Sequence, residues 1–319
     1  MNSRERILAT FYGEKVDKIP VDAWWSEEIY KRIKLEKGVN PNIYYNLDTR
    51  RLCIEAPSLK NEWKEFLQLN KDDIKIYEYP FPDKEMAETN INNLGSKIRR
   101  IKKEGYPAIG HIGSVCFEAA WGLMGMENFF MSIYDNYDIL DDITDKISDI
   151  KLDMAMQFVK NGIDIIHMGD DFGAQKGLLI SKVKWKRLIM PKIEKIIKAV
   201  KMVNKDCLVF FHSDGDIYDI IEDFINIGVD FFNPIQPECM DISEVEKKFS
   251  NKIAFWGGIG SQSTLYLKKD KISESVKNTI NILGRGKRFV ISPTHMIQGN
   301  VPIENIDYFF EAIGYYGSN

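Results

Sequence analysis

Side chains that can bind a metal ion or transfer a proton stand directly after one strongly apolar stretch of the sequence. Residues 207–211 read CLVFF and are followed by His212, Ser213 and Asp214. If the stretch is a buried strand, the spacing of two residues places His212 and Asp214 on the same face. The pair could then share a metal ion, or the Asp214 carboxylate could orient the imidazole. In the structural alternative Asp214 caps the next helix, but Asp216 is placed to cap that helix instead.

Two adjacent carboxylates, Asp170 and Asp171, follow a second apolar stretch, which contains His167. Neighbouring carboxylates repel each other, so at least one of them must meet a cation, a donor-rich ligand or solvent. Gly173 permits a close backbone approach, and Gln175 supplies an amide that both donates and accepts. The segment is equally consistent with catalytic carboxylates and with a solvated turn before the next helix.

Further candidates lie after other apolar stretches. Glu238 and Cys239 form a carboxylate–thiol pair that offers metal ligands, although Cys239 taken alone fits a rigid turn. His295 follows the last apolar stretch and is a second candidate histidine ligand. Glu118 lies among aromatic and methionine residues, where it is either a side chain reaching solvent or a buried functional acid.

The elements that must position these residues alternate along the chain. Seven apolar stretches indicate buried strands, at 19–24, 106–113, 162–170, 207–214, 228–235, 252–259 and 288–295. Amphipathic patterns between them predict helices at 128–160, 182–204, 217–227, 242–249, 272–283 and 302–313. Strands that are apolar on both faces and separated by helices indicate a parallel sheet covered by helices. We predict one (β/α)8 TIM barrel over residues 1–319, with an eighth strand within 50–105.

A barrel explains why polar residues follow nearly every predicted strand. The carboxyl ends of all its strands face one cavity, so residues far apart in the sequence become neighbours. All four histidines of the chain lie at or near such ends. The full set is Asp22; His111; His167, Asp170 and Asp171; His212 and Asp214; Asn233, Gln236 and Glu238; Gly257 and Gly258; Thr294 and His295.

The composition excludes several classes of function. The chain has 319 residues, 44% of them hydrophobic and 28% charged, with a formal net charge of −4. A negative balance offers no basic field for nucleic acid or an anionic membrane surface, and no apolar run has the roughly 20 residues of a membrane helix. The charged N-terminal stretch lacks a signal-peptide pattern, and the four cysteines are scattered, so we expect a cytoplasmic protein without a disulfide framework. P-loop, GxGxxG, GxSxG and HExxH motifs are absent from the sequence.

Five segments, in this order, resemble the uroporphyrinogen decarboxylase superfamily over nearly the whole chain. They are RERILATFYGEKVDKIPVD, MGDDFGAQKGLLIS, FFHSDGD with GVDFFNPIQP, FWGGIGSQSTL, and SPTHMIQGNVPIENI. The resemblance implies a distorted (β/α)8 barrel, in agreement with the pattern of strands and helices.

The resemblance also bears on the reaction. The decarboxylases carry an Arg- and Gly-rich loop after the first strand that grips the substrate carboxylates, whereas this chain reads PVDAWWSEEIYKRI there. The other large branch contains zinc-dependent methyltransferases that serve corrinoid proteins, and its thiol-methylating members use a His-x-Cys pair. Here Asp214 replaces the cysteine, which predicts a harder, more oxygen-rich site than thiol activation requires.

The leading hypothesis is therefore a methyltransferase. It would move a methyl group from a small methoxylated or methylated donor to a corrinoid protein, with zinc as Lewis acid. Asp170, Asp171, His212 and Asp214 would be catalytic. The metal ligands would come from His212, Asp214, Glu238, Cys239 and His295. The substrate would contact Asp22, Trp24, Trp25, Glu118, Trp121, Gln175, Asn233 and Gln236.

Two other functions stay open. A decarboxylase acting on a polycarboxylate such as uroporphyrinogen would need cationic side chains in the cavity. A barrel that only binds a corrinoid or tetrapyrrole would change the ligand's spectrum without turnover. The oligomeric state also stays open, with a homodimer as one expectation.

Overall fold

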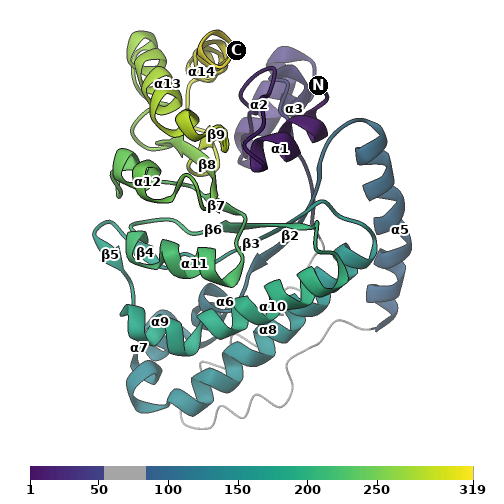
Figure 1. Ribbon diagram of the computed structural model, residues 1–319, viewed down its shortest axis with the longest axis vertical. Helices are drawn as coiled ribbons and strands as arrows, with labels where there is room; N and C mark the ends of the chain where they lie inside the picture. The colour runs from purple at the N-terminus through teal and green to yellow at the C-terminus, as the bar shows by residue number, and fades with distance from the viewer. Residues whose placement is uncertain (54–83, 319) are drawn as a thin grey trace.

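A curled parallel sheet forms the centre of the molecule (Figure 1). The computed structural model describes residues 1–53 and 84–318, and of residues 84–92 it describes the backbone alone. The seven strands follow the order β1-β2-β3-β6-β7-β8-β9. Their bounds are β1 Arg50–Cys53, β2 Ala108–Ser114, β3 Ile165–Gly169, β6 Leu208–His212, β7 Phe231–Asn233, β8 Ala254–Ile259 and β9 Phe289–Pro293. Each neighbouring pair is parallel, so the carboxyl ends of the strands share one edge of the sheet.

Helices surround the outer face of this sheet (Figure 1). Before β2 the chain forms α1 Ser3–Phe11, α2 Glu27–Lys37, α3 Pro41–Tyr44 and α5 Lys84–Lys103. Between β2 and β6 lie α6 Phe117–Met124, α7 Met126–Asp135, α8 Tyr137–Lys160, α9 Lys182–Leu188 and α10 Met190–Val203. The remaining helices are α11 Ile221–Ile227, α12 Ile242–Phe249, α13 Lys269–Leu283 and α14 Ile303–Tyr316. A short hairpin, β4 Gly173–Ala174 and β5 Gly177–Leu178, follows β3.

The parallel α/β architecture predicted from the sequence is confirmed, with one strand in a different place. β1 is the strand expected within 50–105. The stretch predicted as a strand at 19–24 instead makes isolated parallel bridges to β9 and its following loop, Val21 to Ile291 and Trp25 to Ile297. Proline at position 20 cannot donate to a ladder, and the Asp48 carboxylate takes the Val21 N–H. These two facts interrupt regular pairing in this stretch.

Two predicted helices are each divided in two. The predicted helix 128–160 breaks at Asn136, which has φ −139° and ψ 48° and so leaves the helical region between α7 and α8. The predicted helix 182–204 breaks between α9 and α10, where Pro191 lacks the N–H that would bond to the Arg187 carbonyl. Both breaks lie outside the sheet and leave its strands unaffected.

Alternate residues of the strands point inward and form a separate apolar cluster. It comprises Ile109, Ile165, Leu208, Phe210, Phe231, Ala254, Trp256 and Val290, and Ile7 of α1 joins it. Because side chains alternate along a strand, His111, His167 and His212 lie on the same inward side, further toward the carboxyl ends. The apolar cluster therefore forms a floor beneath the polar residues.

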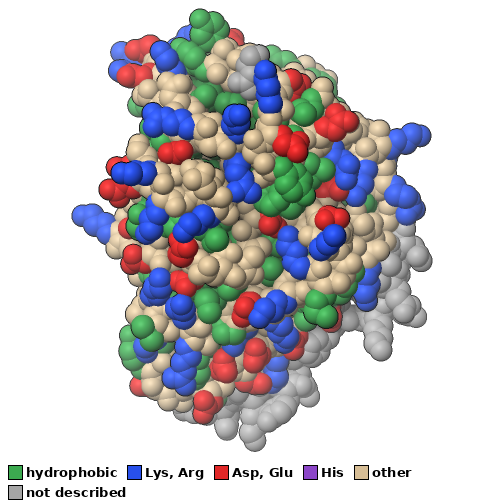
Figure 2. Space-filling model, viewed as in Figure 1, with side chains coloured by type: hydrophobic (Ala, Val, Ile, Leu, Met, Phe, Trp, Pro, Cys, Tyr) green, Lys and Arg blue, Asp and Glu red, His purple; other side chains and the backbone are tan. Residues whose placement is uncertain are grey.

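The surface carries mixed charges. Lys and Arg side chains are interspersed with Asp and Glu over the face shown in Figure 2. Among the described residues, no helix combines the length and the hydropathy that crossing a membrane requires.

Candidate functional site

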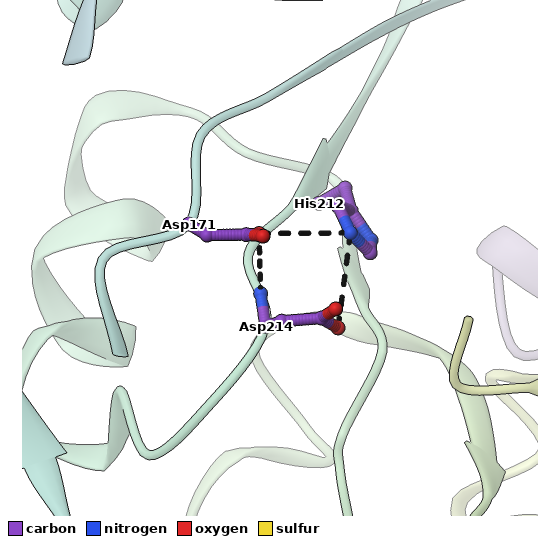
Figure 3. Close-up of side chains that lie close together, drawn as sticks. All are labelled: Asp171, His212 and Asp214. Atoms are coloured by element: carbon purple, nitrogen blue, oxygen red, sulfur yellow. Dashed lines mark hydrogen bonds and ion pairs between the residues drawn. The ribbon is translucent and has the colours of Figure 1, made fainter. Parts of the chain in front are cut away.

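Three predicted residues converge where β3 and β6 end (Figure 3). One potential ligand atom from each of Asp171, His212 and Asp214 lies within 4.8 Å of the other two. His212 Nε2 is 3.7 Å from Asp171 Oδ1 and 3.7 Å from Asp214 Oδ1. Each side chain is partly buried, so the cluster is open to solvent on one side. We call these three residues the carboxylate–histidine trio.

Two glycines bring the carboxylates of the trio together. Gly215 has φ +86°, and a Cβ atom there would lie 2.3 Å from the Gly173 carbonyl carbon. This close approach allows the Gly173 N–H to donate to the Asp214 carbonyl at 3.2 Å. The Asp214 N–H in turn donates to Asp171 Oδ1 at 2.8 Å. Only glycine fits such a contact at positive φ, so the sequence fixes the distance between the two loops here.

Asn233 fixes the protonation pattern of the His212 ring. The Asn233 amide nitrogen donates to the Trp256 carbonyl at 2.9 Å, so the amide oxygen faces His212 Nδ1 at 2.5 Å. An oxygen acceptor requires Nδ1 to carry a proton, which leaves the Nε2 lone pair facing the two carboxylates in the neutral ring. Neutral imidazole beside carboxylates is a donor set that a divalent cation favours.

Replacement of Asn233 tests this orientation. We expect Asn233→Leu to weaken zinc binding about 10–100-fold, because it removes the acceptor that holds His212 in its ligating tautomer. Asn233→Asp keeps an acceptor toward Nδ1 and should lose less affinity. Equilibrium dialysis with zinc measures both variants. Equal affinities for the Leu variant and the wild type would contradict the proposed role of Asn233.

The electrostatics of the trio favour a bound cation. Burial raises the pKa of Asp214; His212 and His295 oppose the rise, while Asp171 and Glu238 add to it. Asp214 Oδ1 is buried and has no hydrogen-bond partner within residues 1–53 and 93–318. A buried carboxylate oxygen without a donor is costly. A cation near His212 Nε2 would satisfy this oxygen and relieve the repulsion between the carboxylates.

Glu118 lies beside the trio at the start of α6. Its Oε2 accepts from the Asp171 N–H at 3.3 Å. Burial, together with the charges of Asp171 and Asp170, raises the pKa of Glu118 to about 7. This carboxyl group therefore holds its proton over part of the neutral range, which a general acid requires.

The Glu118 shift predicts a pH dependence of stability. A carboxyl whose pKa rises on folding stabilises the fold below its unfolded pKa and loses that contribution as pH rises to the folded value. The window here runs from the ordinary glutamate pKa of 4.5 to the raised pKa of about 7. We therefore expect Glu118→Gln to gain about 1–2 kcal/mol relative to wild type between pH 5 and pH 8. Urea unfolding of the zinc-free proteins at both pH values measures this gain in unfolding free energy. A stability difference between variant and wild type that does not change with pH would contradict the prediction.

Asp170 is placed differently from its neighbour Asp171. It is fully buried, and its two oxygens accept from the backbone N–H groups of Val115, Cys116, Phe117 and Glu118 at 2.9–3.1 Å. Burial raises the pKa of Asp170 to about 6, although these donors oppose the rise. Asp170 thus caps α6 from a distant part of the chain, and its oxygens are fully occupied by this contact. The structure thus gives Asp170 a structural contact and does not place it in the trio, and its catalytic role stays a prediction.

Three predicted metal ligands surround the trio but do not join it. The Glu238 carboxylate accepts from Ser263 Oγ at 2.5 Å, and its Oε2 is buried without a partner among the described residues. The His295 ring is exposed, with its centroid 6.4 Å from that of His212. The Cys239 thiol contacts Gln175 Oε1 at 3.7 Å and lines a separate cavity of about 260 Å³. Burial and nearby carboxylates raise the pKa of Cys239, which keeps it a protonated thiol and a poor ligand.

Trp24 and Asp22 lie on the inner side, as predicted, and belong to a cluster with Arg51. The Trp24 ring centroid is 5.2 Å from those of both His167 and His212. Asp22 is fully buried and pairs with Arg51, Nη2 to Oδ2 at 2.6 Å. Sequence reasoning missed Arg51 because β1 was not located. A signal was available: Arg51 and Cys53 are two positions apart, so they share one face of the strand. They pair with Ile109 and His111, which point inward.

The remaining predicted substrate residues have structural contacts. Trp25 donates to Asn42 and stacks on Tyr45, so it packs against the N-terminal helices away from the trio. Gln236 is buried and accepts from the Gly215 N–H, which supports the turn after Asp214. Trp121 packs on Phe117 and Phe130 within the α6–α7 layer. Gln175 is exposed at the β4–β5 turn. Asn233, as shown above, is committed to His212.

The other two inward histidines form a stacked pair. The ring centroids of His111 and His167 are 4.2 Å apart. Burial, with the Arg51 charge as a further cause, lowers the pKa of His111 to about 4. Burial also lowers the pKa of His167 well below its ordinary value. Both rings are therefore neutral at physiological pH.

The fold and the trio define a parallel α/β protein with a candidate metal centre at the carboxyl ends of its strands. The sequence matches the family model of uroporphyrinogen decarboxylase (URO-D) over residues 64–316. The chain belongs to the URO-D family, as the resemblance in its sequence predicted.

Individual relatives differ in their names. The chain is 25% identical to the uroporphyrinogen decarboxylase of Actinobacillus succinogenes over 74% of its own length and 67% of that protein. It is 23% identical to the enzyme of Rickettsia bellii over 71% of its length and 65% of that protein. The matches thus span about two thirds of these relatives. A solved methyltransferase from Methanosarcina mazei shares the fold, with a TM-score of 0.72, 18% identity and 99% of both chains covered.

Proposed function

We propose that the chain is a metal-dependent methyltransferase that takes a methyl group from a small methoxylated or methylated compound. The acceptor in this proposal is the corrinoid of a separate protein. The observation that carries the proposal is the carboxylate–histidine trio, with the lone pair of His212 and the unpartnered Asp214 oxygen facing one point. Zinc is the proposed metal, because nitrogen and carboxylate oxygen are among its usual ligands.

The donor set supports a leaving group that is an oxygen rather than a thiol. Asp171, His212 and Asp214 would hold the ion, and Glu238 and His295 lie close enough to influence Asp214 through their charge. Carboxylate ligands suit a harder Lewis acid than thiolates do. When bound, the ion would polarise the bond between the methyl carbon and its oxygen or nitrogen.

The surrounding side chains supply the rest of the proposed chemistry. The carbon–oxygen bond of the donor breaks, the methyl group passes to the acceptor, and the leaving oxygen takes a proton. Glu118 is placed beside Asp171 to supply this proton, since its carboxyl group stays protonated up to a pH near 7. Trp24 provides a flat apolar wall next to His212.

The comparisons agree with this proposal at different levels. The family consists of enzymes, and the structure that covers the chain from end to end is named a methyltransferase.

We also propose that residues 20–25 complete an eight-stranded barrel. The Asp22 N–H donates to the Ile291 carbonyl of β9, and the Ile291 N–H donates back to the Pro20 carbonyl. On the other side, the Asp48 N–H donates to the Val21 carbonyl just before β1. A cytoplasmic location and a homodimer stay predictions.

A decarboxylase is the second candidate function, and one residue favours it. Arg51 supplies a cationic side chain on the inner side of the sheet, which decarboxylation of a polycarboxylate requires. The curated relatives also carry that name.

A single set of assays separates the two functions. Purified protein would be analysed for bound metal and then mixed with cob(I)alamin and a series of methoxylated aromatic and aliphatic donors, with methylation followed by absorbance. We expect zinc-dependent methylation with at least one donor. Metal-free protein that is inert with every donor would overturn the proposal, and carbon dioxide release from uroporphyrinogen would establish the alternative.

A further inference from the structure

One edge of the Arg51 guanidinium is committed to Asp22. Nη1 donates to Asp22 Oδ1 at 3.0 Å and Nη2 donates to Asp22 Oδ2 at 2.6 Å. Nη1 also reaches Thr49 Oγ1 at 3.2 Å. Both indole N–H groups of Trp24 and Trp256 donate to the same Asp22 oxygen, at 3.2 and 3.1 Å. This network fixes the position of the guanidinium plane.

The other edge of the guanidinium has no such partner. Arg51 Nε is buried and makes no hydrogen bond to any described residue. Nη2 carries a second hydrogen on the same side as Nε–H, and the two N–H groups point in parallel. This pair of donors matches the two oxygens of a carboxylate, which is the usual partner of arginine in a bidentate contact. The Arg51 side chain keeps 18% of its surface exposed, so it is not sealed in the core.

Trp24 connects this edge to the trio. The Arg51 Cζ atom lies 5.0 Å from the Trp24 ring centroid, and the His212 ring centroid lies 5.2 Å from the same point. The guanidinium and the His212 ring therefore both lie close to the Trp24 indole. A small molecule bound beside this indole would have one group at His212 and another at Arg51.

We propose that the free edge of Arg51 binds a carboxylate group of the substrate. The substrate class is then a small carboxylic acid that carries its methyl group about one aromatic ring away from the carboxylate. This inference rests on the proposed function for the role of the trio, but the carboxylate contact stands on Arg51 alone.

Binding of two matched probes tests the contact without any methyl transfer. Benzoate and its neutral isostere benzamide would be titrated into the purified full-length protein by calorimetry, with and without zinc. We expect a preference for benzoate of about tenfold or more, as a bidentate charged contact provides. Equal binding of the two probes, or binding of neither, would overturn the inference.

Three variants test whether Arg51 is responsible for the preference for benzoate over benzamide. Arg51→Lys keeps a charge for Asp22 but lacks the forked edge, so the preference for benzoate should fall to about unity. The double variant Asp22→Asn with Arg51→Gln removes both charges and leaves none buried alone, and should lose the preference as well. Arg50→Gln is the matched control, because Arg50 lies over the Tyr106 ring and bonds to backbone carbonyls. If Arg51→Lys keeps the preference, the inference is wrong.

The outcome is separable from that of the proposed function. A benzoate preference in a protein that never methylates cob(I)alamin would support the contact and overturn the methyltransferase. Methyl transfer that proceeds equally from 4-methoxybenzoate and 4-methoxybenzamide would support the methyltransferase and overturn the carboxylate contact.

Discussion

The His212→Ala variant is expected to bind zinc at least about 100-fold more weakly than the wild type, and under the proposed function its methyl transfer should fall with metal occupancy. This is the largest functional effect that we predict. His212 contributes the only nitrogen ligand of the trio. Without it, Asp171 and Asp214 remain as two carboxylates that repel each other, with Asp214 Oδ1 still lacking a donor. The loss should therefore exceed that of Asn233→Leu, which leaves the ring in place.

Zinc affinity would be measured by competition with a chromophoric chelator at constant pH. His295→Ala is the matched control, since that ring is exposed and stands 6.4 Å from the His212 ring. We expect it to change the affinity far less. A His212→Ala protein that retains wild-type affinity would place the metal elsewhere, and a larger loss in His295→Ala would return that residue to the ligand set predicted from the sequence.

The Asp170→Ala variant is expected to lose about 3–5 kcal/mol of unfolding free energy, although Asp170 touches no ligand atom of the trio. Its carboxylate accepts four backbone N–H groups at the start of α6. The residue before that helix, Cys116, makes no side-chain cap, so the N–H groups of Cys116, Phe117 and Glu118 would lose their acceptor, while the Val115 N–H keeps the Gly169 carbonyl. Helix α6 also carries Glu118, and its displacement would disturb the trio indirectly.

Urea unfolding of zinc-free protein measures the loss. Asp171→Ala is the natural comparison, because the two residues are adjacent and Asp171 is partly exposed. It removes one backbone contact and should cost about 1 kcal/mol. Similar stabilities of the two variants would show that the α6 cap carries little energy.

The sequence predicted the architecture well because its signals were local and repeated. Apolar stretches followed by polar residues predicted six of the observed strands near their positions. These six are β2, β3, β6, β7, β8 and β9. It failed at 19–24, where an apolar stretch containing proline pairs only in isolated bridges. It placed β1 only within the broad range 50–105, because the arginines at 50 and 51 concealed a strand whose inward side chain is charged.

The sequence predicted which residues gather at the candidate site better than it predicted what each of them does there. His212, Asp214 and Asp171 were named from their spacing and lie together in the structure. The sequence could not separate Asp170 from Asp171, because their difference arises from helix α6, more than fifty positions away along the chain, whose N–H groups select one carboxylate. Asn233 was assigned to the substrate for a similar reason: its partner, the Trp256 carbonyl, belongs to a neighbouring strand. Arg51 depended on locating β1.

The backbone contact between Gly173 and Gly215 has a consequence for how this site can change. The position of residue 214 is held by main-chain contacts between two loops and by the Asp171 carboxylate, which accepts from the Asp214 N–H. The Asp214 side chain takes no part in these contacts, so a different side chain at position 214 would enter the same frame without rebuilding it. Under the proposed function, replacing Asp214 by cysteine would therefore change an oxygen-rich candidate site into one that contains sulfur, while the two loops keep their backbone contact.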